Sequence, residues 1–218
     1  MKTKALIYGI SGLALALSMS SAIAVPVSTT TIFDDQFNRS GGNTVGNSWS
    51  EINEQASDVK ITGNALKLSG QATDSTATVA SPDAAVTHTI STVGYQNVAV
   101  QFSWAALTAS DATDFLGVAW KKSSDSTYTY LYSFALGGDG TYSTASFNLG
   151  SLADNTSIDL RFWTNVDEDN EGATIDWVTV SATSIPATTQ SSAVPEPATF
   201  ALLGIGLLCA GVARRRKS

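Results

Sequence analysis

The sequence predicts an all-β protein, built as a two-sheet antiparallel sandwich, with a short apolar helix at each end of the chain. Three observations support this fold class. Short segments of alternating apolar and polar residues recur, turn residues separate them about every ten positions, and no segment keeps a helical period over three turns. The 218 residues, with both ends set aside, suffice for one such domain and its core.

The expected strands follow in chain order. Early strands are expected at residues 32–37, 59–62, 65–68 and 86–90, with Gly63 and Asn64 forming a hairpin turn. Later strands are expected at 98–104, 128–134, 158–162 and 174–180. Trp104 keeps phase with the apolar residues of its strand and is expected in the core. The row of Tyr128, Tyr130 and Tyr132 is either a core layer or a binding strip.

The N-terminal 24 residues read as a signal peptide. Lys2 and Lys4 precede an uncharged run, and Ala22 and Ala24 place small residues where a signal peptidase accepts them. We therefore expect signal peptidase as a partner and Val25 as the mature N-terminus.

The C-terminal end has a second export signature, in which Pro195, Glu196 and Pro197 precede an uncharged stretch at 198–213. As a helix this stretch would span about 24 Å, slightly less than a bilayer core of about 30 Å. The basic residues Arg214, Arg215, Arg216 and Lys217 follow it. Because Lys and Arg stay on the cytoplasmic side, we expect a membrane helix with a cytoplasmic C-terminus.

Residues 194–218 resemble the PEP-CTERM sorting signal of Gram-negative bacteria in their motif, apolar stretch and basic end. The resemblance implies an exosortase-type processing enzyme as partner, and an association with exopolysaccharide and biofilm. It also implies export across the inner membrane, anchorage until processing, and then a place at the cell surface or in the extracellular matrix. It covers 25 residues and says nothing of the remaining chain.

Charge narrows the choice of partners. Residues 25–197 hold all 19 acidic residues but only six of the 12 basic ones, a net charge of −13. Such a domain repels phosphate backbones, so no nucleic-acid partner is expected. The single cysteine, Cys209, lies in the tail, so no disulfide is expected in the exported domain.

Short motifs near both ends of the exported region indicate the kind of sandwich. They are residues 33–39, the segment 46–49 that ends in Trp49, and residues 174–180. These resemble the first and last strands of jelly-roll domains related to concanavalin-like lectins and carbohydrate-binding modules. The resulting domain organisation is a signal peptide at 1–24, a sandwich at 25–183, a polar linker at 184–193 and the sorting signal at 194–218.

Several catalytic classes are disfavoured. The exported region has no cysteine and a single histidine, His88, which lies in an alternating strand pattern rather than near a nucleophile. The Glu-x-Asp-x-x-Glu pattern of sandwich glucanases is absent. We therefore expect no enzyme and no catalytic residue, although a glycan-degrading hydrolase stays open as an alternative.

An acidic turn is the best candidate for a metal site. Asp167, Asp169 and Glu171 alternate before a glycine, like the first half of a calcium loop. The second half is missing, so other oxygens would be needed, and the candidates are Asp176, Asp34 and Asp35. No cofactor is certain; structural calcium is the one ion suggested, and a solvated hairpin tip is the alternative.

Trp163 is the best candidate for ligand contact, because it is out of phase with the apolar row of its strand. It shares a face with Arg161 and Asp159, so ring, donor and acceptor would project together toward a sugar. The alternative is a tryptophan that covers the edge of the sandwich.

Three functions follow. The first is a non-catalytic structural or adhesive protein of the envelope or exopolysaccharide. The second is a lectin-like module that binds extracellular polysaccharide, and the third is the hydrolase. The predicted fold is compatible with all three.

Overall fold

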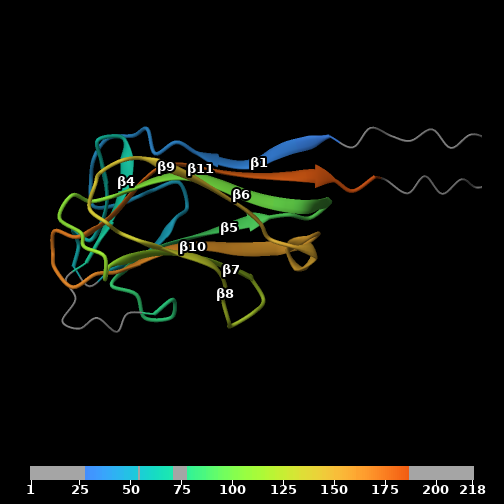
Figure 1. Ribbon diagram of the computed structural model, residues 1–218. Coiled ribbons are helices and arrows are strands. Elements are labelled where there is room, and N and C mark those ends of the chain that lie inside the picture. Colours follow the sequence, from blue (N-terminus) through green and yellow to red (C-terminus); the bar gives the residue numbers. More distant parts are fainter. Residues whose placement is uncertain (1–27, 54, 71–77, 187–218) are drawn as a thin grey trace, which may run out of the picture.

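The computed structural model describes residues 28–53, 55–70 and 78–186. Within these ranges the fold class is confirmed, because eleven β-strands and one 3₁₀ turn form two antiparallel sheets (Figure 1). In the same ranges no helix is long and apolar enough to span a membrane. The two helices expected at the chain ends lie outside the described residues.

The first sheet has the order β3-β4-β11-β6-β9, and β1 pairs with the second half of β11. Its strands are β1 (Thr29–Asp35), β3 (Val59–Thr62), β4 (Ala65–Ser69), β6 (Tyr95–Ala106), β9 (Ser143–Asn148) and β11 (Gly172–Ser184). The turn between β3 and β4 is the predicted one, since Gly63 and Asn64 both have positive φ, 58° and 62°, as a tight hairpin requires.

The second sheet has the order β2-β5-β10-β7-β8. Its strands are β2 (Ser50–Asn53), β5 (Ala84–Ser91), β7 (Phe115–Lys122), β8 (Thr129–Ala135) and β10 (Ser157–Asn165). The 3₁₀ turn η1 (Ser151–Ala153) precedes β10. Sequence patterns missed β2, β7 and β9, of which β7 is almost continuously buried and so shows no alternation.

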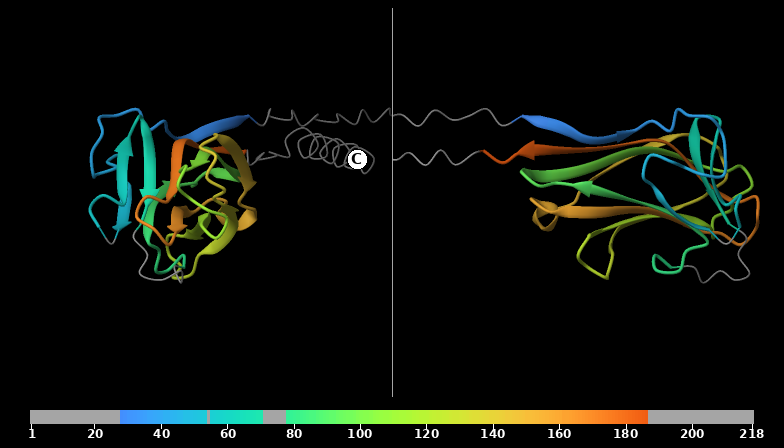
Figure 2. Two further views of the ribbon diagram at one scale, coloured as in Figure 1. Left: turned by 60° about the vertical axis from the view of Figure 1, so that its left-hand side comes forward. Right: turned by 180° about the vertical axis from the view of Figure 1, so that it is seen from behind.

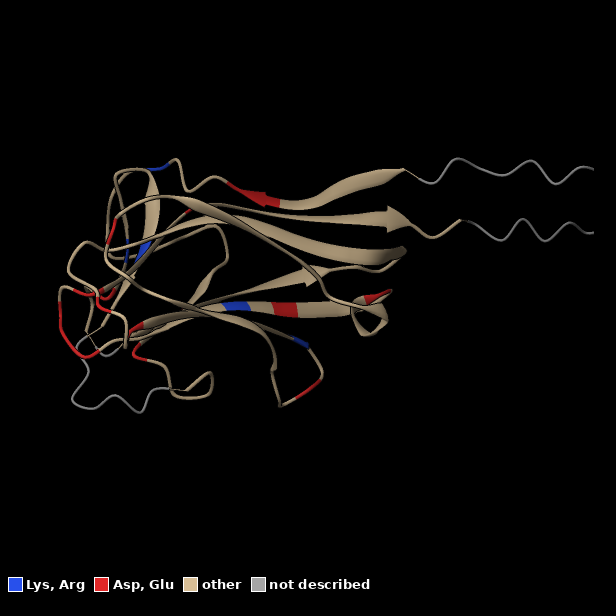
Figure 3. Ribbon diagram, viewed as in Figure 1, with Lys and Arg blue, Asp and Glu red and all other residues tan. Residues whose placement is uncertain are grey.

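The core lies between the two sheets. Its largest fully buried members in the facing layers include Phe102, Phe162, Leu66, Leu160 and Ile175. The strands run lengthwise, and β1 begins and β11 ends at the same end of the sandwich (Figure 2). Many of the acidic residues lie in loops at the opposite end (Figure 3).

The prediction that the tyrosines of β8 lie on one face is wrong. The pairing of β8 with β7 shifts register between Val118 and Ala119. Tyr130 therefore pairs with Ala119 and reaches Trp163, whereas Tyr132 pairs with Val118 and reaches Phe134. A β-bulge thus sends alternate tyrosines to opposite faces of the sheet.

Candidate ligand-binding site

The outer face of β10 carries the three residues predicted to contact ligand. Asp159, Arg161 and Trp163 alternate along the strand and share this face, as predicted. The prediction that the Trp163 ring is exposed is wrong, because only 2% of the residue is exposed. Its indole packs edge-on against Phe115 and Tyr130, with ring centroids 4.9 and 6.1 Å away.

Two features bury Trp163. Its partner on β7 is Gly117, and a Cβ there would stand 2.2 Å from the indole Nε1, so only glycine leaves room for the ring. Val79 and Ala85 pack with the ring in a small apolar cluster outside the main core. Among the described residues the indole Nε1 has no hydrogen-bond partner, so their packing holds the ring.

The polar neighbours of Trp163 are also occupied by the chain itself. Arg161 donates to Thr87 Oγ1 at 2.9 Å and to the Val79 carbonyl at 2.6 Å, and its guanidinium lies 4.3 Å from the Tyr128 ring centroid. Asp159 accepts hydrogen bonds of 2.8 Å from both Thr89 and Ser123 and pairs with Lys121 at 3.4 Å.

These contacts also fix the ionisation of Asp159. Partial burial opposes its charge, but the hydrogen bonds from Ser123 and Thr89 and the nearby Lys121 lower its pKa overall. The carboxylate is therefore charged and already paired. Ligand contact by Asp159, Arg161 and Trp163 stays a prediction that now requires displacement of the chain's own groups.

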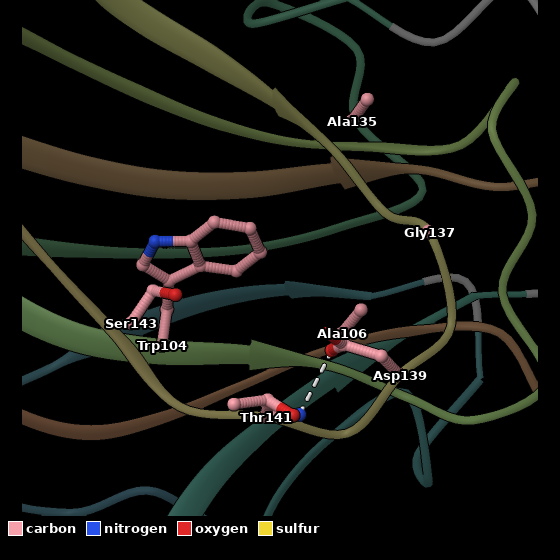
Figure 4. Close-up of a pocket in the computed structure, with 7 residues that line it drawn as sticks. All are labelled: Trp104, Ala106, Ala135, Gly137, Asp139, Thr141 and Ser143. Atoms are coloured by element: carbon pink, nitrogen blue, oxygen red, sulfur yellow. Dashed lines mark hydrogen bonds between the residues drawn. The ribbon is translucent and has the colours of Figure 1, made fainter.

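A second region, missed from the sequence, is open. Trp104 was expected in the core, but it is partly exposed beside a hollow of about 160 Å³ between β6, β8 and β9. The hollow is lined by Trp104, Ala106, Ala135, Gly137, Asp139, Thr141 and Ser143. Figure 4 shows the ring of Trp104 near Ser143, its partner across the β6–β9 ladder. An aromatic ring beside two hydroxyls and a carboxylate is a geometry suited to a sugar.

Aromatic rings continue from the hollow along the open side of the sandwich. Trp104 and Phe134 have centroids 4.6 Å apart, Phe134 and Tyr132 4.8 Å apart, and Tyr132 stacks on Phe147 at 6.2 Å. Of these rings Tyr132 is the most exposed, at 55%. We call Trp104, Phe134, Tyr132 and Phe147 the aromatic edge. It lies open because β8 and β9 are the last strands of their sheets.

The loop that borders the hollow is held in place. Gly138 has a φ of 62°, and a Cβ on it would stand 2.3 Å from the Ser110 carbonyl oxygen, so the loop packs against its neighbour. Asp139 accepts a 2.9 Å hydrogen bond from the Thr141 amide (Figure 4). This hydrogen bond therefore holds the Asp139 carboxylate in place beside the hollow.

The residues predicted to bind calcium are only partly brought together. Asp167 and Glu171 converge with Asp114, which was not predicted, and their oxygens lie within 4.8 Å of one another. Among the described residues this group does not include Asp169, Asp176, Asp34 or Asp35. The acidic turn folds back on itself, because Glu171 Oε2 accepts hydrogen bonds from the amides of Asp167 and Glu168.

Two of these three carboxyl groups, Glu171 and Asp114, have raised pKa values. Burial, the hydrogen bond with Asp167 and the charge of Asp114 raise the pKa of Glu171 to about 7. Burial also raises the pKa of Asp114, to which Asp111 and Asp167 add repulsion. Oxygens this close would suit a hard cation, which would relieve that repulsion.

Asp34 and Asp35 have other partners. Asp34 accepts hydrogen bonds from Gln36 and from Thr179, at 2.8 and 2.9 Å. Asp35 is buried and accepts hydrogen bonds from Arg39, Asn47, Trp49 and the Phe37 amide. Although burial opposes its charge, these donors lower the pKa of Asp35 to about 2. Asp35 therefore ties the first strand to the loop before β2.

Comparison with known proteins finds one sequence match. The PEP-CTERM protein-sorting motif matches residues 193–217, so the chain carries the sorting signal of an exported protein that an exosortase processes. No curated protein matches the chain. The sorting residues Pro195, Glu196 and Pro197, the expected helix 198–213 and the basic cluster lie outside the described residues.

Several solved structures align with much of this chain. The K3 adhesin domain of Lys-gingipain from Porphyromonas gingivalis is 14% identical, with 71% of this chain and 99% of that chain covered and a TM-score of 0.48. A family 29 carbohydrate-binding module is 12% identical, with 73% and 90% covered and a TM-score of 0.42. At these values the likeness concerns the arrangement of strands and not the function.

Proposed function

We propose that this chain is an exported, non-catalytic protein of the cell envelope or its exopolysaccharide, and that its sandwich binds carbohydrate at the aromatic edge. The observation that carries the proposal is the hollow that the partly exposed Trp104 indole lines together with Asp139 and Thr141 of the neighbouring loop and Ser143 of β9. The apolar face of a sugar stacks on such a ring, and its hydroxyls bind the polar rim.

The charge of the hollow favours an uncharged glycan. Among the described residues that line it, Asp139 is the only ionisable one, and none is Lys or Arg. A polyuronate would meet repulsion there and from the acidic domain as a whole. A neutral polysaccharide is therefore the expected ligand.

The residues that line the hollow also favour binding without hydrolysis. A glycosidase needs two carboxyl groups about 5–9.5 Å apart across the scissile bond. Asp139 has no second carboxylate beside it in the lining of the hollow. The three-carboxylate group of Asp114, Asp167 and Glu171 includes two buried members, and none of the three is among the described residues that line the hollow.

The experiment is affinity electrophoresis of the purified chain through gels that contain a panel of neutral and acidic polysaccharides. Trp104→Ala should weaken retention by a neutral polysaccharide at least about tenfold, a loss near 1.4 kcal/mol. Tyr142→Ala is the matched control, because Tyr142 is an exposed residue of the same loop but does not line the hollow. Equal retention of Trp104→Ala and the parent chain would refute the site, and turnover of any polysaccharide would refute the non-catalytic role.

A further inference from the structure

The large exposed apolar and aromatic side chains of the described residues fall mainly into two groups. Three are tyrosines of β8 or of the loop before β9. Three others are aliphatic, namely Val93, Leu152 and Ile185, which are 61%, 65% and 40% exposed. Single exposed aliphatic residues are ordinary, but a group at one place on a molecule marks a contact surface.

Hydrogen bonds hold these three residues together. The Ile185 amide donates to the Gly94 carbonyl at 2.9 Å, next to Val93. The Gly94 amide donates to Asn155 Oδ1 at 2.9 Å, and Thr92 Oγ1 donates to the Ala153 carbonyl at 2.6 Å, which fixes the segment that carries Leu152. The β5–β6 turn, η1 and the residue that follows β11 therefore form one surface. We call Val93, Leu152 and Ile185 the aliphatic end.

This surface lies where the chain leaves the sandwich toward its sorting signal. Thr29 at the start of β1 pairs with Thr183 near the end of β11, so both described ends lie here (Figure 2). Twelve residues, 186–197, separate Ile185 from the apolar stretch at 198–213 that is expected in the membrane. Even fully extended they reach at most about 43 Å. When the sorting segment lies in a membrane, the aliphatic end therefore stays within that distance of it.

We infer that the aliphatic end is a docking surface for the lipid bilayer in which the sorting segment is held. Exposed aliphatic tips can enter the outer about 5–10 Å of a bilayer, where the interface accepts apolar groups. Three such side chains bind weakly by themselves. A short tether turns this weak contact into an intramolecular one, at a high effective concentration.

Docking would orient the proposed glycan site. β6 begins at this end with Tyr95, and Trp104 lies nine residues further along the strand. At about 3.3 Å per residue, the hollow lies about 30 Å from the aliphatic end. The sandwich would then stand on the membrane with its aromatic edge directed toward the matrix. The docking inference rests on the sorting segment being in a membrane and not on glycan binding.

Quenching by brominated lipid tests the docking. The full chain carrying Leu152→Trp is reconstituted in phosphatidylcholine vesicles, with or without bromine near the top of the acyl chains. The emission that the substitution adds to the parent chain should fall by at least half in brominated vesicles. Val93→Trp is a second reporter for the same surface, should the first variant fold poorly. Ile52→Trp is the matched control, because Ile52 is also exposed but lies in β2, toward the other end of β5.

Each outcome decides the inference. Strong quenching of the Leu152→Trp or Val93→Trp variant, with none for Ile52→Trp, supports it. Equal quenching of all three, or none in chains that float with the vesicles, overturns it in favour of a surface covered by a second copy or by the chain itself. Chains that do not associate with vesicles also overturn it. Retention by neutral polysaccharide is measured on the same chains, so failure of docking and failure of the glycan site are distinguished.

Discussion

The outer face of β10 and the aromatic edge carry similar chemistry in opposite states. The β10 face combines Trp163 with tyrosines, hydroxyl groups and the Asp159 carboxylate. The aromatic edge combines Trp104 and Tyr132 with the hydroxyl groups and carboxylate of the adjoining hollow. At β10 the chain fills every position itself, since Arg161 binds the Val79 carbonyl and Trp163 is buried under neighbouring rings. At the aromatic edge Trp104 and Tyr132 keep exposed surface, because no strand follows β8 or β9 in its sheet.

This difference indicates where binding energy is available. A group already paired in the free protein must lose its partner before it can bind a ligand, and the net gain is small. An open ring needs no such exchange. The structure therefore moves the candidate glycan site from Trp163 to Trp104.

The largest expected effect separates the two tryptophans by stability. Trp163→Ala removes a buried ring and leaves a cavity, which should cost about 3–5 kcal/mol of unfolding free energy. Trp104→Ala should cost less, because its ring is partly exposed. Urea unfolding of both variants measures the difference. Equal losses of unfolding free energy would contradict this contrast, since they would make Trp104 a core residue.

A smaller loss is expected on the β10 face from the opposite strand. Gly117→Ala places a methyl group against the Trp163 indole and should cost about 1–3 kcal/mol by overpacking. Gly137→Ala is the control, because a Cβ there would meet nothing within 4 Å. Thermal unfolding of the two variants compares them. An unchanged melting temperature for Gly117→Ala would show that the β10 face yields easily and could admit a ligand.

Two buried carboxyl groups, Glu171 and Asp35, have pKa values shifted in opposite directions. Their contributions to stability therefore depend on pH in opposite ways. Glu171 keeps its proton to about pH 7 when folded, against an ordinary value of 4.5, so its stabilising contribution is lost as pH rises between these values. Asp35 is the reverse, and its contribution is lost as pH falls from 3.8 toward about 2.

Glu171→Gln tests the first of these statements. The variant should be more stable than the parent chain at pH 8, by about 1–2 kcal/mol, and the two should converge below about pH 5. Unfolding in urea across this pH range provides the measurement. A parent chain whose stability does not change between pH 5 and 8 would contradict the raised pKa.

Calcium gives a related but smaller expected effect. If Asp114, Asp167 and Glu171 hold a calcium ion, millimolar calcium should raise the melting temperature at pH 8 by a few degrees, and a chelator should reverse it. The Glu171→Gln variant should lose the response. No shift in the parent chain would leave the acidic turn as a folded loop without an ion.

The smallest expected effect concerns the two exposed tyrosines of β8. Tyr132→Ala should weaken retention by neutral polysaccharide several-fold, whereas Tyr130→Ala should leave it unchanged, because the bulge directs Tyr130 toward Trp163. Affinity electrophoresis compares them. An equal loss for both would mean that ligand reaches both faces of the second sheet.

The sequence by itself determined the fold class, the turn at Gly63 and Asn64, and most of the strands, because alternation and turn chemistry are local properties. It also determined the sorting motif, which is a contiguous stretch recognised as sequence. Strand β7 was not predicted, because a strand buried on both faces shows no alternation of apolar and polar residues.

Only the tertiary structure decided which aromatic rings are open. Alternation placed Trp163 on the outer face correctly, but the burial of that face depends on Val79 and Gly117, which are distant in sequence. Trp104 kept the phase of a core residue and became accessible because β8 and β9 end their sheets. The carboxylate group likewise joins Asp114 to a turn more than fifty residues later. Exposure is set by what packs across from a residue, and local pattern cannot carry that information.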